Sequence, residues 1–395
     1  MPNRTSDVII IGGGASGLSA AIAAGRSGAK VAVLERNIRV GKSILATGNG
    51  RCNISNSTIG KPDSLLQYHN AEFVSPVIKR YDSTSIRLYF FDLGLLTIVD
   101  KNGWVFPRTQ SANTVLDVIM KEVERLSVSC YTGQEIIGLR ISEEGYRVET
   151  TSASYSARSL ILACGVEPLL TAFAFLDTVL PTPILGPLKT DIDPIRGLDG
   201  VRVTCKVDLK DGDRTVASEE GEILFRDYGV SGIAIFNLSR FAKPGQYLYM
   251  DFFPELTERD LEAMLEKRLT KRPEMNSNDL LTGMLHSRLI QAIVRKSKNR
   301  INQASEQNML YPLVQAMKKY QLKVTGGPIK EHAQAMRGGL GINNFDPVTL
   351  AAIKQTGLYA CGECIDVDGP CGGYNLHWAW ASGLVAGERA AEYAL

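Results

Sequence analysis

The sequence predicts an α/β protein in which a domain built on a parallel sheet is interrupted by a β-rich segment and then by a helical one. Three observations support this fold class. A strand–turn–helix–strand unit occupies Val8–Glu35, and a strand followed by a long helix occupies Gly357–Tyr393. Between them, prolines and a glycine crowd Pro181–Pro187, and a charged helical pattern begins at Thr257. Such changes are expected where a chain crosses between domains.

The N-terminal unit is a βαβ arrangement. Val8–Ile11 is a short apolar run bounded by glycine, which is typical of a buried parallel strand. The alanine-rich stretch Leu18–Gly25 is helical, and Lys30–Glu35 is a second strand. Further along the first domain, Ser111–Leu126 has apolar residues at helical spacing, and Ser159–Ala163 is another buried strand.

Three glycines join the first strand to the first helix in the pattern G-x-G-x-x-G. Gly12 permits a tight turn, Gly14 allows the backbone to approach a pyrophosphate, and Gly17 allows the helix to pack on the strand. The helix N-terminus then offers free N–H groups to phosphates. Glu35 ends the second strand, where a carboxylate can accept hydrogen bonds from an adenosine ribose and disfavour a 2′-phosphate. The unit therefore predicts a Rossmann-like site for an adenine dinucleotide.

The other end of the chain distinguishes FAD from NAD. The strand in Gly357–Glu363 stops on Gly362 and is followed by a carboxylate, which in two-part flavin sites reaches the ribityl chain or the pyrophosphate edge. A loop then enters a helix near Tyr374, after Gly372 and Gly373. A helix N-terminus aimed at the flavin pyrimidine ring would stabilise negative charge on the reduced flavin. We therefore expect non-covalent FAD.

Four motifs resemble those of a bacterial flavoprotein family called HI0933-like, which includes aminoacetone-oxidase-like and bile-acid-reductase-like members. They are the G-x-G-R-C-N-x-[ST]-N motif at Gly48–Asn56, the long motif Asp366–Trp380, the segment Glu220–Gly232, and Trp104–Pro107. The resemblance spans nearly the whole chain. It implies an FAD-dependent oxidoreductase that acts on a small organic substrate in an interdomain cleft, by hydride transfer at flavin N5.

The resemblance also implies a three-part architecture. The FAD domain would comprise residues 1–187 and 324–395, with an inserted β-barrel-like domain at 188–253 and a small helical domain at 254–323. One departure concerns the loop after Ala163, which begins Cys164-Gly165 where family members continue with A-T-G-G and a longer loop. Because this loop would lie near the flavin, its shortening puts any particular family substrate in doubt.

The expected FAD contacts come from both ends of the chain and from the polar, glycine-rich loop Gly41–Asn56. Arg51 would hold a phosphate or a flavin carbonyl, and Cys52 would pack under the flavin or take part in redox chemistry. The complete set is Gly12, Gly14, Ala15, Ser16, Gly17, Glu35, Arg36, Lys42, Ser43, Gly50, Arg51, Cys52, Asn53, Ala163, Gly165, Gly362, Glu363, Gly372, Gly373, Tyr374 and Asn375.

Four residues are candidates for catalysis. His377 lies in the first turn of the flavin-facing helix and would act as an acid or base near pH 7, or else as a hydrogen-bonded packing residue. Tyr374 and Asn53 would line the flavin, and Tyr228 would reach it from the inserted domain. Cys361-x-x-Cys364 has the spacing of a redox or metal motif, but no second ligand pair accompanies it. No metal site is expected.

Composition limits the partners. The 395 residues carry a formal net charge of +2, which gives no long-range field to attract nucleic acid or an anionic membrane. The sequence shows no signal peptide and no apolar run of membrane-spanning length, so a cytoplasmic protein is expected. No second G-x-G-x-x-G follows a strand, so NADH or NADPH would dock directly onto the flavin. A flavin-dependent RNA-modifying protein and a non-catalytic flavin-binding sensor are the alternative functions, and the oligomeric state stays open.

Overall fold

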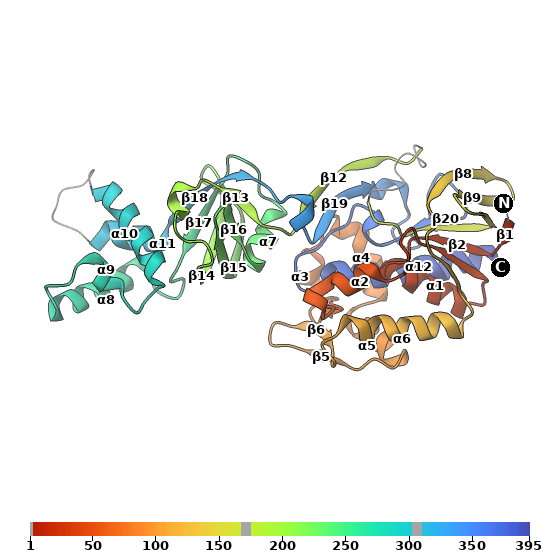
Figure 1. Cartoon of the computed structure of the whole chain (residues 1–395), viewed down its shortest axis with the longest axis horizontal. Helices are drawn as coiled ribbons and strands as arrows, with labels where there is room; N and C mark the ends of the chain where they lie inside the picture. Colours follow the sequence, from red (N-terminus) through yellow and green to blue (C-terminus); the bar gives the residue numbers. More distant parts are fainter. Residues whose placement is uncertain (1–2, 167–174, 302–309) are drawn as a thin grey trace. The chain divides into compact units, whose positions relative to one another are not determined.

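The computed structural model describes residues 3–166, 175–301 and 310–395 (Figure 1). The chain divides into two compact units, one formed by Met1–Thr182 with Met336–Leu395 and the other by Pro183–Ala335. Each unit has its own cluster of buried apolar side chains. The first unit therefore unites the two ends of the sequence, as the predicted discontinuous FAD domain requires.

The first unit is built around five parallel strands. Their order is β20, β11, β2, β3 and β7, and all four pairings are parallel. Every residue of β2, β3 and β11 is buried, which explains why these strands are continuous apolar runs in the sequence. The bounds are β20 Leu358–Ala360, β11 Ser159–Leu162, β2 Val8–Ile11, β3 Val31–Leu34 and β7 Ser129–Tyr131.

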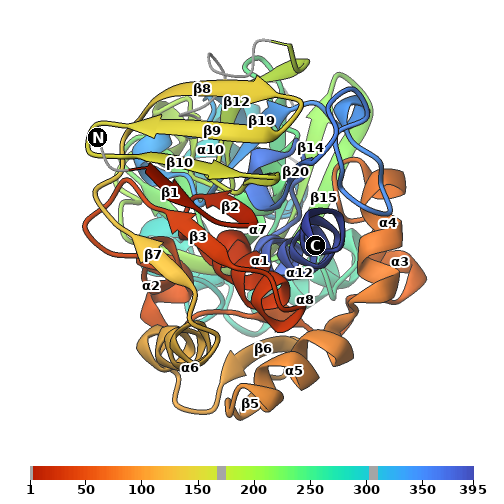
Figure 2. The ribbon, with the colours of Figure 1, turned by 90° about the vertical axis from the view of Figure 1, so that its right-hand side faces the viewer.

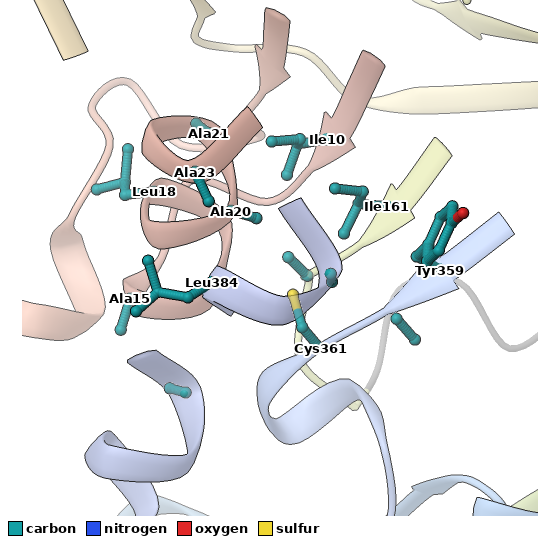
Figure 3. Packing of buried hydrophobic residues seen from close by; sticks show 14 of the residues in the cluster. Ile10, Ala15, Leu18, Ala20, Ala21, Ala23, Ile161, Tyr359, Cys361 and Leu384 are labelled. Atoms are coloured by element: carbon teal, nitrogen blue, oxygen red, sulfur yellow. The ribbon is translucent and has the colours of Figure 1, made fainter. Parts of the chain in front are cut away.

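Two helices from opposite ends of the chain, α1 (Ala15–Arg26) and α12 (Tyr374–Ala394), pack side by side beneath the sheet (Figure 2). Glycines make the close approach possible. A Cβ atom on Gly383 would lie 2.3 Å from the carbonyl oxygen of Ser16, and one on Gly387 would lie 2.3 Å from that of Ala20. Figure 3 shows Leu384 of α12 packed beside α1. Gly383 and Gly387 thus allow α12 to pack directly against the helix that follows the glycine turn.

The rest of the first unit surrounds this centre. Helix α6 flanks α1, and two smaller sheets have the orders β1-β10-β9-β8 and β4-β6-β5. The helices are α2 Lys42–Ala46, α3 Pro62–Leu65, α4 Ala71–Arg80, α5 Ser83–Asp92 and α6 Ala112–Arg125. The strands are β1 Asn3–Thr5, β4 Ser55–Asn56, β5 Thr97–Val99, β6 Trp104–Pro107, β8 Ile136–Ser142, β9 Gly145–Thr150 and β10 Ser154–Ala157.

The second unit is a closed six-stranded barrel with helices packed on it. The barrel order is β13-β16-β15-β14-β17-β18. Leu261 and Leu265 of α8 belong to the same buried cluster as the barrel residues, so barrel and helices share one core. The strands are β13 Leu188–Thr190, β14 Arg202–Asp211, β15 Arg214–Arg226, β16 Gly229–Ser231, β17 Tyr247–Asp251 and β18 Tyr320–Gly326. The helices are α7 Ile233–Ser239, α8 Glu258–Lys271, α9 Ser277–Leu281, α10 Ser287–Ile301 and α11 Leu310–Lys318.

The predicted fold class, an α/β protein with a Rossmann-like domain and an inserted barrel, is confirmed. The unit boundaries fall at Thr182/Pro183 and Ala335/Met336, five residues before and twelve residues after the predicted boundaries at 187/188 and 323/324. The reason is local, because the paired strands β12 (Thr178–Ile184) and β19 (Ala335–Leu340) carry the chain from one unit to the other. The shortened loop after Cys164 lies largely outside the described residues. No helix of the described chain is long and apolar enough to cross a membrane.

Candidate flavin site

The glycine-rich turn between β2 and α1 is shaped by close backbone contacts. Gly12 has a φ of +107°, and a Cβ atom there would lie 2.4 Å from the carbonyl oxygen of Ala163. A Cβ atom on Gly17 would lie only 1.9 Å from the carbonyl oxygen of Gly12. Gly14 precedes α1 without a side-chain cap, and the first turn of α1 contains no acidic residue. The positive end of α1 is thus left to an external anion, as a pyrophosphate site requires.

Glu35 lies directly behind this turn and is 8% exposed. Its Oε2 accepts a hydrogen bond from the backbone N–H of Gly13 at 2.7 Å, and its Oε1 accepts one from the N–H of Asn37 at 2.8 Å. The carboxylate therefore fixes the conformation of the turn. Oε1 also accepts a bond from the side-chain amide of Asn37, so Oε2 is the oxygen that can accept a further bond, and contact with a ribose stays a prediction. Arg36 is exposed beside it.

The loop Gly41–Asn56 is more structured than the sequence suggests. It contains α2 and a 3₁₀ turn at Thr47–Gly50, and a Cβ atom on Gly14 would lie 3.2 Å from Ser43 Oγ. Ser43 thus borders the glycine turn, and Lys42 beside it is exposed. The loop therefore starts against the expected pyrophosphate site.

Cys52 is fully buried and has a φ of +58°. Burial raises the pKa of its thiol to about 11, so this group is protonated at neutral pH. That geometry supports the interpretation of Cys52 as a packing residue and not as a nucleophile.

The G-x-G-R-C-N loop is hydrogen-bonded to the start of α12. With its amide oriented to satisfy its neighbours, Asn53 accepts from the N–H of Gly373 at 3.2 Å and donates to Ser55 O and Val105 O at 2.9 and 3.1 Å. The Asn56 amide donates to the carbonyl of Gly372 at 3.2 Å. Two motifs that lie over three hundred residues apart in the sequence therefore form one structure.

The N-terminus of α12 is also open to a ligand. Gly373 precedes the helix with a φ of +100°, has no side chain to cap it, and would place a Cβ atom 2.4 Å from Ser55 O. No acidic residue lies in the first turn. Both long helices thus present uncapped positive ends, one for each end of a dinucleotide.

Glu363 is a half-buried carboxylate with no hydrogen-bond or ion-pair partner among the described residues. Desolvation, and secondly the charge of Asp368, raises the pKa of this carboxyl to about 7. The preceding Gly362 has a φ of +68°, and a Cβ atom there would meet Ser16 Oγ at 2.4 Å. Glu363 is thus a carboxylate without a partner that lies next to the start of α1. Such a group is suited to accept hydrogen bonds from the hydroxyl groups of a ribityl chain.

His377, in the first turn of α12, is completely buried between this helix, Ser55 of β4 and Tyr81, which precedes α5. Its Nε2 lies 2.9 Å from the carbonyl oxygen of Tyr81, which can only accept, so Nε2 carries the ring proton. Its Nδ1 then accepts from the hydroxyl of Ser55 at 2.8 Å. Burial lowers the pKa of His377 to about 4. A neutral imidazole with both nitrogens engaged supports the packing alternative.

The two tyrosine candidates occupy different units. Tyr374 is buried in the first unit, where its hydroxyl lies 3.1 Å from Thr58 Oγ1 and its ring lies 5.3 Å from that of Tyr68. Tyr228 lies in the second unit, in the turn between β15 and β16, and is half-buried. Their catalytic roles stay predictions.

All seven cysteines are free thiols. The neighbouring Cys364 and burial raise the pKa of the Cys164 thiol, and burial raises the pKa of Cys361 to about 12. The remaining cofactor candidates lie around these groups: Ala163 is buried against the glycine turn, Gly165 follows Cys164 with a φ of +71°, and Asn375 bonds the backbone of Gly369. No group of three or more His, Cys, Asp or Glu side chains that could hold a metal was found in the described part of the chain.

Sequence reasoning missed several residues that build the site. Ser55 holds His377, and Arg337 pairs with Asp368 through contacts of 2.7 and 3.0 Å. The indole N–H of Trp380 donates to the carbonyl of Ile54 at 3.2 Å. All are long-range contacts, which a single sequence does not reveal.

The uncapped N-termini of α1 and α12 and the carboxylate of Glu363 fit FAD. Comparison with known proteins places the chain in the class of FAD-dependent oxidoreductases. The chain belongs to the HI0933-like family, since residues 6–389 match the family described as "HI0933-like protein Rossmann domain". This confirms the resemblance predicted from the motifs.

Two relatives cover almost the whole chain. A "3-dehydro-bile acid delta(4,6)-reductase" of Clostridium scindens is 36% identical over 97% of this chain and 98% of its own length. A "Ribosomal RNA dihydrouridine synthase" of Escherichia coli is 27% identical over 95% of this chain and 96% of its own. Among solved structures, a 3-ketosteroid-delta4-(5alpha)-dehydrogenase from Rhodococcus jostii RHA1 shares the fold, with a TM-score of 0.52 and 16% identity over 99% of this chain and 98% of that one.

Proposed function

We propose that this protein reduces a carbon–carbon double bond conjugated to a carbonyl group. The observation that carries the proposal is the 36% identity to a reductase along nearly the full length of both chains. The name of that relative describes reduction of double bonds next to a 3-oxo group. Dihydrouridine, named in the second relative, is uridine with the double bond beside its carbonyl reduced. Both names thus describe one type of reaction.

When bound and reduced, FAD would supply a hydride from N5 for the carbon β to the carbonyl, and would be left oxidised. A proton must then reach the α carbon, so that the product gains two electrons and two hydrogens in all. Tyr374, in the first unit, is the proposed source of this proton, either directly or through water. The catalytic role of Tyr228 stays a separate prediction. We propose that the flavin is re-reduced by NADH or NADPH, which docks on the flavin itself.

The protein's own contribution would be positioning and charge stabilisation. The uncapped N-terminus of α1 would bind the diphosphate, and that of α12 would face the flavin pyrimidine ring and stabilise the charge of the reduced form. Glu363 would accept bonds from the ribityl hydroxyls. Asn53 and His377 would act as positioning residues, because they tie the flavin loop to α12.

The test uses purified holoprotein under anaerobic conditions. NADH or NADPH should bleach the flavin, and a steroid acid with a 3-oxo group conjugated to a double bond should restore its colour with formation of the saturated ketone. Deuterium from reduced flavin should appear at the β carbon. A reduced flavin that ignores every such acceptor but reacts rapidly with oxygen would instead indicate an oxidase.

A second candidate substrate is RNA, because a second relative acts on ribosomal RNA by its name. The net charge of +2 weighs against tight RNA binding. The two candidates differ in a measurable way. An RNA-directed enzyme should bind a ribosomal RNA fragment with an affinity that falls steeply with salt, and should form dihydrouridine in it. A reductase of small molecules should do neither.

A further inference from the structure

Arg51 carries a cation that the protein does not neutralise. Its side chain is exposed, and no carboxylate pairs with it among the described residues. The guanidinium carbon lies 4.8 Å from the centroid of the Phe106 ring, and Nε makes only a long contact of 3.4 Å to the carbonyl of Gly48. Stacking on a ring restricts the guanidinium and leaves its N–H groups available for a ligand.

The surface under Arg51 continues to the start of α12. The rings of Phe106 and Trp104 lie 6.3 Å apart, and a Cβ atom on Gly372 would lie 2.7 Å from Trp104 Nε1. A Cβ atom on Gly48 would lie 3.9 Å from the Phe106 ring. Both the turn that carries Arg51 and the turn that begins α12 therefore rest on the same pair of aromatic side chains. The cation is held beside the helix end that we expect to face the flavin ring.

A role in binding the FAD diphosphate does not suit this position. The diphosphate is expected at the N-terminus of α1, next to Gly14 and Ser43, at the other end of the same loop. The oxidised flavin ring offers only neutral carbonyl oxygens to a guanidinium, whereas a carboxylate offers a charged, bidentate partner.

We propose that Arg51 binds an anionic group of the substrate, and that the substrate is a carboxylate-bearing α,β-unsaturated carbonyl compound. This inference rests on the proposed function. A carboxylate is favoured over the phosphates of a nucleic acid because Arg51 is the only cation stacked on the Phe106 ring among the described residues. Residues 43–60 and 102–107 contain no other lysine or arginine, and the nearest in sequence are Lys42, Lys61, Lys101 and Arg108. A nucleic acid backbone would need several cations along its path.

The experiment measures binding to oxidised holoprotein by perturbation of the flavin spectrum and by calorimetry. The probes are a bile acid with a 3-oxo group and a conjugated double bond, and its uncharged carboxamide. Arg51→Ala should weaken binding of the carboxylate tenfold or more, since a charge-assisted bond is lost, and leave binding of the carboxamide within twofold. Arg51→Lys should restore part of the loss. Increasing salt should weaken only the carboxylate complex.

Arg108→Ala is the matched control, because it removes an equally exposed arginine just beyond β6. It should change neither affinity. Equal loss for both probes, or loss of FAD from Arg51→Ala, would overturn the inference and return Arg51 to the cofactor. Inorganic phosphate or an RNA fragment that competes in an Arg51-dependent way, without a preference for the carboxylate probe, would also overturn it. Arg51-dependent binding without reduction of the double bond would refute only the proposed reaction.

Discussion

His377 shows how burial decides the chemistry of one residue. Its pKa falls from 6.5 to about 4, because the imidazole is buried neutral between Tyr81 and Ser55. A depressed pKa stabilises the folded state above pH 6.5, and that stability is lost as the pH falls toward 4. At ~1.4 kcal/mol per pH unit, the loss from this group amounts to about 3 kcal/mol. We expect denaturant unfolding of the holoprotein, measured from pH 7 to 4, to show this slope.

Replacement by glutamine separates this effect from other titrating groups. His377→Gln should lower the free energy of unfolding at pH 7 and flatten the slope between pH 6.5 and 4. His332→Gln, at an exposed position, should leave both unchanged. If His377→Gln kept the full wild-type slope, the buried neutral imidazole would not be its source.

Glu363 predicts a pH dependence of FAD binding, because burial shifts its pKa in the opposite direction to that of His377. Its carboxyl has a pKa raised to about 7 by desolvation when no ligand donates to it. Hydroxyl donors on the ribityl chain favour the ionised form, so FAD binding should release a proton below pH 7. Affinity measured by quenching of FAD fluorescence in apoprotein should rise by up to about tenfold per pH unit toward pH 7 and then level off.

The variant Glu363→Gln should bind FAD more weakly at pH 8 and lose this pH dependence. Glu72→Gln changes an exposed acid in the same unit and should behave as wild type. A pH profile that survives in Glu363→Gln would assign the proton to another group.

At the scale of elements, the sequence predicted what depends on local pattern. The apolar runs of β2, β3 and β11, the glycine turn and the period of α12 follow from residues close together in the chain. The contacts of Asn53 with Gly373 and of Ser55 with His377 could not be predicted in this way. They depend on the parallel sheet bringing the two ends of the chain together, and a single sequence carries no signal for such pairs.

The contact between α1 and α12 gives a prediction about glycine. Gly387→Ala places a methyl group 2.3 Å from the carbonyl oxygen of Ala20 and must push the helices apart. We expect a destabilisation of about 1–3 kcal/mol, typical of overpacking. Gly383→Ala should cost a similar amount and also weaken FAD binding, because it displaces Ser16 at the phosphate end of α1.

Gly327→Ala is the control for these two variants, since a Cβ atom there has no neighbour within 4 Å. Its stability should equal or slightly exceed that of wild type. Denaturant unfolding and FAD titration of the three variants would test both the loss of stability and the loss of FAD affinity. Unchanged stability of Gly387→Ala would mean that the helices are not in close contact.

For the whole molecule, the family resemblance implied the discontinuous FAD domain, and the changes of composition at Pro181 and Thr257 agreed with it. The crossing predicted at Pro181–Pro187 contains the unit boundary at Thr182/Pro183, although its first two prolines lie within a strand, β12, which the sequence did not indicate. The helical segment also offered no sign in the sequence that Leu261 and Leu265 would join the core of the barrel. Amphipathic periodicity shows which face of a helix is buried. It does not show which other element covers that face, because this depends on how the whole unit is assembled.

Two separate cores predict two unfolding events with different responses to cofactor. Because the glycine turn, Glu363 and the start of α12 all belong to the first unit, excess FAD should stabilise that unit alone, by RT ln(1 + [FAD]/Kd). Calorimetry should therefore resolve two transitions, of which one rises with FAD concentration. Leu265→Ala, in the core of the second unit, should lower the midpoint temperature of the other transition. The free energy of unfolding of that unit should fall by ~2–5 kcal/mol, as is typical of truncating a buried leucine. Val33→Ala, in the first core, should lower the FAD-dependent one. A single transition that FAD and both substitutions move together would show that the two units unfold as one.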